Sequence, residues 1–174
     1  MEDKVTVSQI SLKYGLIIGL VFIVYGMILQ FLNLDMKLMQ TLGYVNYAAL
    51  IAVIFLAHKA FKEGGDGYLS MGQGLGIGTL ISLIGGALSG VFSYIYLSFI
   101  DDSMLTKVKD MQVAELESRG MDDAQIDQAM NIAGRFMTPL MMALMSILVM
   151  VIFGFILSLI VSLFTKKANP TLEV

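Results

Sequence analysis

The sequence predicts an all-α integral membrane protein with four transmembrane helices and a polar helical hairpin between the third and fourth of them. Apolar residue types make up 57% of the 174 residues and charged types only 14%, against roughly 25% charged residues in a soluble domain. The mean hydropathy is +0.80. One water-soluble core of this size could not bury so much apolar surface, so the excess indicates lipid as a second apolar solvent. We therefore treat residues 1–174 as a single membrane domain.

The first apolar run predicts a span at about residues 14–32. No charged residue occurs from Leu16 to Leu32, and about 20 residues rising 1.5 Å each cross a hydrocarbon core of about 30 Å. Asn33 and the residues after it do not form the small-x-small site of a cleaved signal peptide. We expect a retained helix, followed by a short polar connection over residues 33–40.

The second run predicts a span at about residues 42–61. Tyr44 and Tyr47 stand at one end of it, and His58 and Lys59 stand at the other. Aromatic and cationic residues at opposite ends are typical of the two membrane interfaces. We expect His58 to be a snorkelling interfacial residue, with its polar atoms directed to water.

The third and fourth runs predict spans at about residues 74–100 and 138–164. Thr138 can cap the last helix, and Pro139 suits its first turn. The polar segment 101–137 separates these two spans. We expect this segment outside the bilayer, and we expect a frayed tail after the fourth span, over residues 168–174.

The polar segment predicts two helices. The first is expected over residues 105–118, ending at Gly120. The second begins at Asp122, which has Gln125 as its partner in a capping box. The alternative is one helix that continues from Asp122 through a kink at Pro139.

Two acidic pairs, Asp101–Asp102 and Asp122–Asp123, precede the two helices of the polar segment. Because carboxylates near a helix start accept backbone N–H groups and suit the helix dipole, we expect both pairs to act as caps. A calcium-binding loop needs denser acidic residues with Gly at its sixth position, which is missing here. These pairs therefore predict no metal site.

Small residues recur every four positions in the third run and predict a helix-packing groove. Helix backbones approach closely where side chains are small, which drives helix association in lipid. The predicted groove consists of Gly74, Gly78, Ser82, Gly86 and Gly90, with Gly15 and Gly19 at the same spacing in the first run and Gly154, Ser158 and Ser162 in the fourth. Three alternatives stay open: packing within one chain, an interface for a second copy or a partner, and a substrate pathway.

Lysines predict the orientation of the chain. Four crossings place both termini on one side, where the lysines concentrate in short segments next to helix ends, as positively charged cytoplasmic loops do. These residues are Lys4, Lys13, Lys59, Lys62, Lys166 and Lys167. We expect both termini to be cytoplasmic, with the acidic hairpin outside.

The sequence lacks the residues that several classes of function require. The net charge of −3 gives no electrostatic basis for nucleic-acid binding, and the chain has no cysteine. The Gly-rich stretch 72–78 lacks the Lys-Ser/Thr of a phosphate loop, and neither a nucleophile–base pair nor an HExxH motif is present. No Asp, Glu, Lys or Arg lies in the middle of a span, where a proton relay would need one. We expect no enzymatic activity, cofactor or metal.

Three stretches carry a resemblance to a known family: 68–74 (YLSMGQG), 85–96 (GGALSGVFSYIY) and 99–101 (FID). Together with the four-span layout and the acidic hairpin, they resemble the DUF4199 family. In this chain Asp102 stands where such proteins commonly have Pro. The resemblance implies a small inner-membrane protein of the Bacteroidota kind, located in the bacterial inner (cytoplasmic) membrane. It supplies no activity and no catalytic residues, and it implies a genomic association, because members of the family are often encoded near a membrane-associated glycosyltransferase.

The functional expectation is a non-enzymatic scaffold or accessory subunit that acts through helix–helix association. Its expected partners are the lipid bilayer and either further copies of the chain or another membrane protein. One alternative is a small channel or transporter formed by an oligomer and lined by Ser82, Ser89, Ser93 or Thr79. The other alternative is an accessory protein of a membrane glycosyltransferase.

Overall fold

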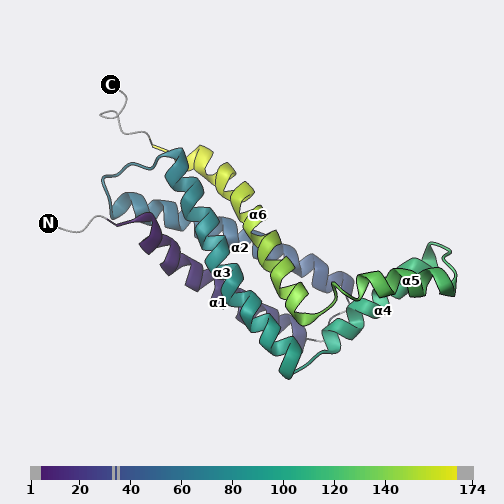
Figure 1. Cartoon of the computed structure of the whole chain (residues 1–174). Coiled ribbons are helices and arrows are strands. Elements are labelled where there is room, and N and C mark those ends of the chain that lie inside the picture. The colour runs from purple at the N-terminus through teal and green to yellow at the C-terminus, as the bar shows by residue number, and fades with distance from the viewer. Residues whose placement is uncertain (1–4, 33, 35, 168–174) are drawn as a thin grey trace. The chain divides into compact units, whose positions relative to one another are not determined.

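Six α-helices make up the computed structural model of the chain within the described residues, which are 5–32, 34 and 36–167 (Figure 1). In chain order they are α1 (Val7–Phe31), α2 (Met36–Glu63), α3 (Met71–Phe99), α4 (Ser103–Ser118), α5 (Asp123–Ala133) and α6 (Pro139–Thr165). In this part of the chain, β-type pairing is limited to an isolated antiparallel bridge between Leu69 and Lys167. The predicted all-α class is confirmed. Of the described helices, α1, α2, α3 and α6 are long and apolar enough to cross a membrane.

Capping boxes start two of the long helices earlier than hydropathy suggests. Thr6 accepts the N–H of Gln9 through Oγ1 at 3.3 Å, and the Gln9 side chain accepts the N–H of Thr6 at 2.9 Å. Ser70 and Gln73 make the same reciprocal pair before α3, at 3.2 and 2.8 Å. Both pairs satisfy N–H groups that a helix start would otherwise leave without partners.

Of the other two long helices, α2 begins earlier than expected and α6 begins where expected. Helix α2 begins at Met36, so the connection before it is shorter than the expected 33–40 segment. Helix α6 begins at Pro139, and the predicted cap is confirmed, with the N–H of Met141 donating to Thr138 Oγ1 at 3.3 Å. Because α5 ends at Ala133, the alternative of one kinked helix is wrong. Residues 33 and 35 of the connection, and the tail expected to be frayed, lie outside the described residues.

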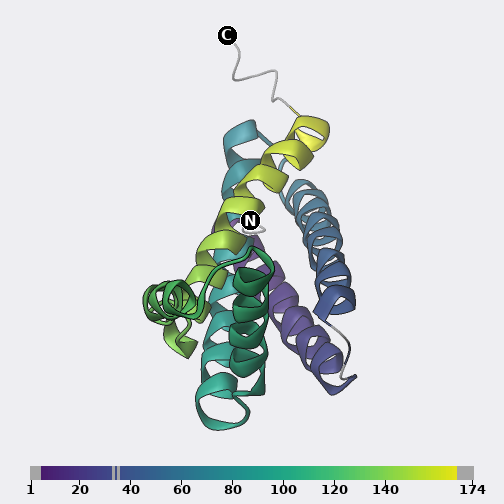
Figure 2. The same ribbon diagram turned by 90° about the vertical axis from the view of Figure 1, so that its right-hand side faces the viewer.

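The chain forms two compact units, one of Met1–Ser89 with Ile147–Val174 and the other of Gly90–Ser146. In the described part of the first unit, α1, α2, α3 up to residue 89 and α6 from residue 147 lie side by side (Figures 1 and 2). Their apolar core is built from Ile10, Ile18, Leu50, Ile54, Ala57, Phe61, Leu69, Ile77, Ile81 and Val161.

The outer faces of the long helices are strongly apolar. Leu20 is 59% exposed, and Phe164 is 85% exposed. Polar side chains occur inside the first unit instead: those that are buried are Ser11, His58, Ser82, Ser158, Ser162 and Thr165. Soluble domains rarely expose apolar patches larger than a few hundred Å². The outer surface of the first unit is therefore unlike that of a typical soluble domain.

The second unit contains the helical hairpin of α4 and α5 (Figure 1). Helix α4 has no buried residue, and in α5 only Ile126 is buried. Gly120, which lies between the two helices, has a φ of 78°, a left-handed conformation that glycine adopts without steric cost. The predicted capping box is confirmed: Gln125 N–H donates to Asp122 Oδ1 at 2.8 Å, and Asp122 N–H donates to Gln125 Oε1 at 3.1 Å.

The start of α4 differs from the expectation. Asp102 occupies the N-cap position but makes no capping hydrogen bond with its side chain. Its neighbour Asp101 instead accepts the N–H of Ser103 at 2.9 Å. The physical reason is the Asp102 backbone, whose ψ of 4° lies far from the extended conformation of a capping residue.

Candidate functional site

Small residues of α3 and α6 face each other along a line that we call the α3–α6 seam. It consists of Gly74, Gly78 and Ser82 of α3 and Ser162, Ser158 and Gly154 of α6. A Cβ atom added at Gly74 would overlap Ser162, one at Gly78 would overlap Ser158, and one at Gly154 would overlap Ser82. Each step of four residues along α3 thus matches a step of four in the opposite direction along α6. The backbones approach closely because one residue of every pair lacks a side chain.

Hydrogen bonds within the seam are directed to backbone carbonyls. Ser158 Oγ donates across the helix interface to Gly74 O at 2.8 Å. Ser82 Oγ donates to Gly78 O of its own helix at 2.9 Å. The Ser162 hydroxyl is buried and has no hydrogen-bond partner among the described residues. One hydroxyl therefore joins the two helices directly, and another is buried without compensation.

His58 joins three helices at one end of the seam. Its side chain is fully buried, with Nδ1 2.7 Å from Thr165 Oγ1 of α6 and Nε2 3.0 Å from Gly74 O of α3. The expectation of a snorkelling residue is therefore wrong. Because α2 continues to Glu63, His58 lies more than a turn inside the helix and faces its neighbours. Lys59 is the exposed residue, and its Nζ lies 3.7 Å from Glu63 Oε1.

The partners of His58 determine what its ring can do. A carbonyl only accepts, so Nε2 must carry the proton that is donated to Gly74 O. The Thr165 hydroxyl has a single proton and lies 2.9 Å from Val161 O as well as 2.7 Å from Nδ1. A neutral ring accepts that proton at Nδ1, whereas a protonated ring donates to Thr165 and leaves the hydroxyl to Val161. In both states the packing of the helices engages both ring nitrogens.

Further contacts close the same end of the first unit. Lys62 Nζ donates to Thr165 O, the last carbonyl of α6, at 3.1 Å. The backbones of Leu69 and Lys167 exchange two hydrogen bonds, at 3.0 and 2.9 Å. The ends of α2 and α6 and the segment before α3 are thus fastened to one another.

The glycines of α1 contact a different face of α3. A Cβ at Gly15 would lie 2.7 Å from Ile84 Cβ, and one at Gly19 would lie 3.1 Å from Gly85 Cα. Ser11 Oγ donates to Ile77 O in the same interface, at 3.4 Å. The contacts advance along both helices in the same direction, so α1 and α3 run parallel.

The other residues of the predicted groove have looser or separate surroundings. A Cβ at Gly86 would lie 3.4 Å from Met150 Sδ, which is ordinary van der Waals contact. Gly90 belongs to the second unit. The residues predicted as one groove therefore divide between the α3–α6 seam, the interface of α1 with α3, and positions outside both.

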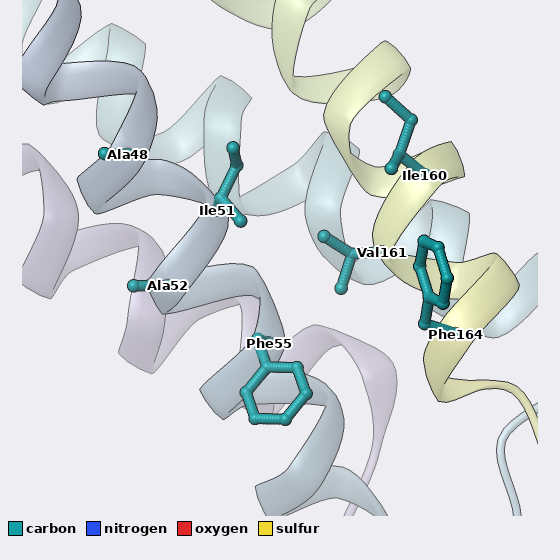
Figure 3. A pocket seen from close by; sticks show the side chains of 7 residues that line it. All are labelled: Ala48, Ile51, Ala52, Phe55, Ile160, Val161 and Phe164. Carbon is teal, nitrogen blue, oxygen red and sulfur yellow. The ribbon is translucent and has the colours of Figure 1, made fainter.

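An apolar groove between α2 and α6, which we call the α2–α6 groove, has no counterpart in the sequence analysis (Figure 3). Its volume is about 430 Å³. It is lined by Ala48, Ile51, Ala52 and Phe55 of α2 and by Ile160, Val161 and Phe164 of α6. The small side chains of Ala48 and Ala52, one turn apart on α2, leave the space open. The spacing of these two alanines is visible in the sequence, but only the fold shows that α6 forms the other wall of the groove.

The polar groups of the first unit are arranged to hold helices together. Within residues 5–32, 34 and 36–167, no three His, Cys, Asp or Glu side chains gather as they would around a metal ion. The polar atoms at the end of the seam are instead directed to carbonyls and hydroxyls of neighbouring helices. The arrangement fixes the mutual positions of α2, α3 and α6.

Comparison with known proteins gives one match. The model of a family described as "Protein of unknown function (DUF4199)" matches residues 13–167, which is most of the chain. The resemblance stated from the three sequence stretches is thereby confirmed. No curated protein and no solved structure matches the chain.

Proposed function

The chain belongs to the DUF4199 family of unknown function, and we propose that it is a multi-span membrane protein that acts as a non-enzymatic scaffold or accessory subunit. In this proposal α1, α2, α3 and α6 cross a bacterial inner membrane, with both termini in the cytoplasm. The hairpin of α4 and α5 lies outside the bilayer. Partners associate with the exposed helix faces and with the hairpin.

The apolar exterior of the long helices carries the proposal. Side chains such as Leu20, Leu148 and Phe164 are more than half exposed, while hydroxyl and imidazole groups are buried between helices. Lipid solvates such an apolar surface without cost. Because the bilayer core offers no hydrogen-bonding groups, every polar backbone group must find its partner inside the protein. Helices meet this requirement, and the four long ones have the length to cross the hydrocarbon core.

The internal contacts support a structural role over transport or catalysis. The hydroxyls of Thr79, Ser82 and Ser89 donate to carbonyls of their own helix at 2.8, 2.9 and 2.9 Å, and Ser82 is packed against Gly154. His58 is used in the same way, with both ring nitrogens bonded. Because the α3–α6 seam is occupied within the chain, we assign partner binding to outward-facing residues.

The absence of cysteine from the chain gives a direct test of the proposed topology. Single cysteines replace Ser118 at the end of α4 and Asp66 in the segment between α2 and α3, and a membrane-impermeant maleimide is applied to spheroplasts. We expect Ser118→Cys to react in intact spheroplasts and Asp66→Cys to react only after permeabilisation. The reverse result would contradict the orientation. Equal reaction of both variants in intact spheroplasts would contradict the four-span arrangement.

Photo-crosslinking tests the scaffold role. A photoreactive amino acid at Leu20, which is 59% exposed, is compared with the same group at Ile18, which is fully buried. We expect Leu20 to give a crosslinked species of defined mass, either a dimer of the chain or a complex with one membrane protein, and Ile18 to give none. A protein that stays monomeric and free of partners in mild detergent, with probes on all four long helices, would refute the role.

A further inference from the structure

The α2–α6 groove is lined on both sides by apolar side chains (Figure 3). Its α2 wall extends from Ala48 to Phe55, seven residues that rise about 10 Å in a helix. The groove has a volume of about 430 Å³, and each of its seven lining side chains is apolar. A lining without polar groups suits a hydrocarbon chain.

Phe55 and Phe164 mark one end of the groove (Figure 3), and lysines follow both of them in the sequence. Lys59 lies one turn after Phe55 on the same face of α2. Lys166 and Lys167 follow Phe164 within a turn and are exposed. Lys62 Nζ contacts the last carbonyl of α6 at 3.1 Å, so this cation lies where the ends of α2 and α6 meet.

Among the described residues at this end, two are acidic and do not cancel its charge. Glu63 Oε1 lies 3.7 Å from Lys59 Nζ in an exposed pair. Asp66 accepts the N–H of Tyr68 at 3.1 Å. Lys167 Nζ lies 5.4 Å from the centre of the Tyr68 ring. Within the described part of the chain, four lysines against two carboxylates leave this end with a net positive charge.

The distance along α2 relates the lysines to the groove. From Ala48 to Lys59 the helix rises about 16 Å, close to half of a hydrocarbon core of about 30 Å. A hydrocarbon chain in the groove would therefore lie within one leaflet, and the lysines would lie at the depth of lipid phosphates. Basic residues at the membrane surface between or beside helices attract anionic headgroups.

We propose that the α2–α6 groove is a binding site for an anionic phospholipid, with one acyl chain between α2 and α6 and the headgroup phosphate on Lys59, Lys166 and Lys167. The apolar walls select a hydrocarbon chain, and the cations select a negative headgroup over a zwitterionic one. This inference rests on the proposed membrane location of the chain.

The chain contains no tryptophan, so one introduced tryptophan reports on one place. Phe55→Trp places the probe in the groove, and Leu20→Trp places the control on an exposed face of α1. Each full-length variant is reconstituted into equal mixtures of phosphatidylglycerol and phosphatidylcholine in which only one lipid has brominated acyl chains. Bromine quenches tryptophan fluorescence on contact, so the two mixtures report which lipid occupies the site.

We expect phosphatidylglycerol to be preferred at Phe55→Trp by at least about fivefold at low salt, the effect of one lysine at a membrane surface, with no preference at Leu20→Trp. Adding Lys59→Gln, Lys166→Gln and Lys167→Gln to Phe55→Trp should bring the ratio close to one. Lys13→Gln, a matched loss of charge on α1, should leave it unchanged. Lys62 is kept because its contact with α6 is structural.

Three results would overturn the inference. Equal quenching of Phe55→Trp by both lipids excludes headgroup selection, and a preference that survives the three lysine substitutions excludes the assigned cations. Quenching at Leu20→Trp without quenching at Phe55→Trp means that protein covers the groove, as in a dimer of the chain. If neither lipid quenches either probe, the proposed membrane location of the chain is itself wrong, and this outcome is distinct from the three above.

Discussion

Polar side chains are used differently in the α3–α6 seam and in the α4–α5 hairpin. In and beside the seam they are buried, and Ser158 and His58 both reach the same carbonyl of α3, Gly74 O, at 2.8 and 3.0 Å. In the hairpin they are exposed and act locally, as in the capping box of Asp122 with Gln125 and the pair of Arg119 with Glu115. The seam joins helices that are far apart in the chain, and the hairpin uses its polar groups to begin and end helices.

The difference follows from the surroundings that we propose for each region. In lipid the hydrophobic effect does not drive helices together, so close packing of small residues and hydrogen bonds between helices must do so. Where water is present, exposed polar groups are already solvated, and their main structural value is to satisfy N–H groups at helix starts. Substitutions can separate these two roles.

Adding bulk to the seam should have the largest effect. In Gly78→Leu the new side chain would overlap Ser158, so we expect the free energy of unfolding to fall by about 3 kcal/mol. The measurement is titration of the micelle-bound protein with sodium dodecyl sulfate, followed by far-ultraviolet circular dichroism. Gly26→Leu is the matched control, because a Cβ at Gly26 meets nothing within 4 Å. Equal losses in the two variants would show that the seam does not stabilise the first unit.

Removing the imidazole should have the next largest effect. His58→Leu leaves Gly74 O with one hydrogen bond fewer and frees α2 from α3 and α6, so we expect a loss of about 1–2 kcal/mol in the same titration. Lys59→Leu, at the adjacent exposed position, removes only a surface ion pair and should change stability by less than about 0.5 kcal/mol. If the two substitutions behaved alike, His58 would not join the helices.

Loss of the cap should be smaller and confined to the hairpin. We expect Asp122→Ala to destabilise α5 by about 1 kcal/mol, because the N–H of Gln125 loses its acceptor. Hydrogen–deuterium exchange should accelerate in α5 and stay unchanged in α1. Asp123→Ala keeps the cap and removes only a charge from the first turn, with an expected effect of about 0.3–0.5 kcal/mol. Faster exchange in α1 after Asp122→Ala would mean that the two regions are not independent.

Removing the Ser158 hydroxyl should have the smallest cost of these changes, and removing the Ser162 hydroxyl should have none. Ser158→Ala removes a hydrogen bond between helices and should cost about 0.6 kcal/mol, the average for such bonds in membranes. Ser162→Ala removes a buried hydroxyl that has no partner in the described part of the chain, so stability should stay constant or rise by up to about 1 kcal/mol. The pair is compared by the same detergent titration. A loss for Ser162→Ala as large as that for Ser158→Ala would contradict the assignment.

Sequence reasoning located the long helices better than their ends. Long runs without charge indicate these helices whatever they pack against in the fold. The capping box of Asp122 with Gln125 indicates the start of α5. The pairs Thr6–Gln9 and Ser70–Gln73 have the same spacing as Asp122–Gln125, but hydropathy does not mark them, because both pairs precede the most apolar residues. Their capping-box pattern is the sequence signal for these two helix starts.

The role of His58 could not be predicted in this way. Its partner Thr165 is 107 positions away along the chain, and its partner in α3 is a backbone carbonyl that any residue could supply. Its neighbour Lys59 suggested an interface, although the two side chains leave the helix about 100° apart. The α2–α6 groove is hidden for the same reason, since its walls come from helices that are distant in sequence.

The order of the facing glycines and serines has a consequence for the register of α3 against α6. A slip of one turn, about 5.4 Å, would place Ser82 opposite Ser158 in one direction or opposite Met150 in the other, so that Ser82 would no longer face a glycine. The imidazole occurs once, and its two nitrogens meet Thr165 and Gly74 in one register only. The single histidine and the order of small residues therefore select the same alignment of the helices.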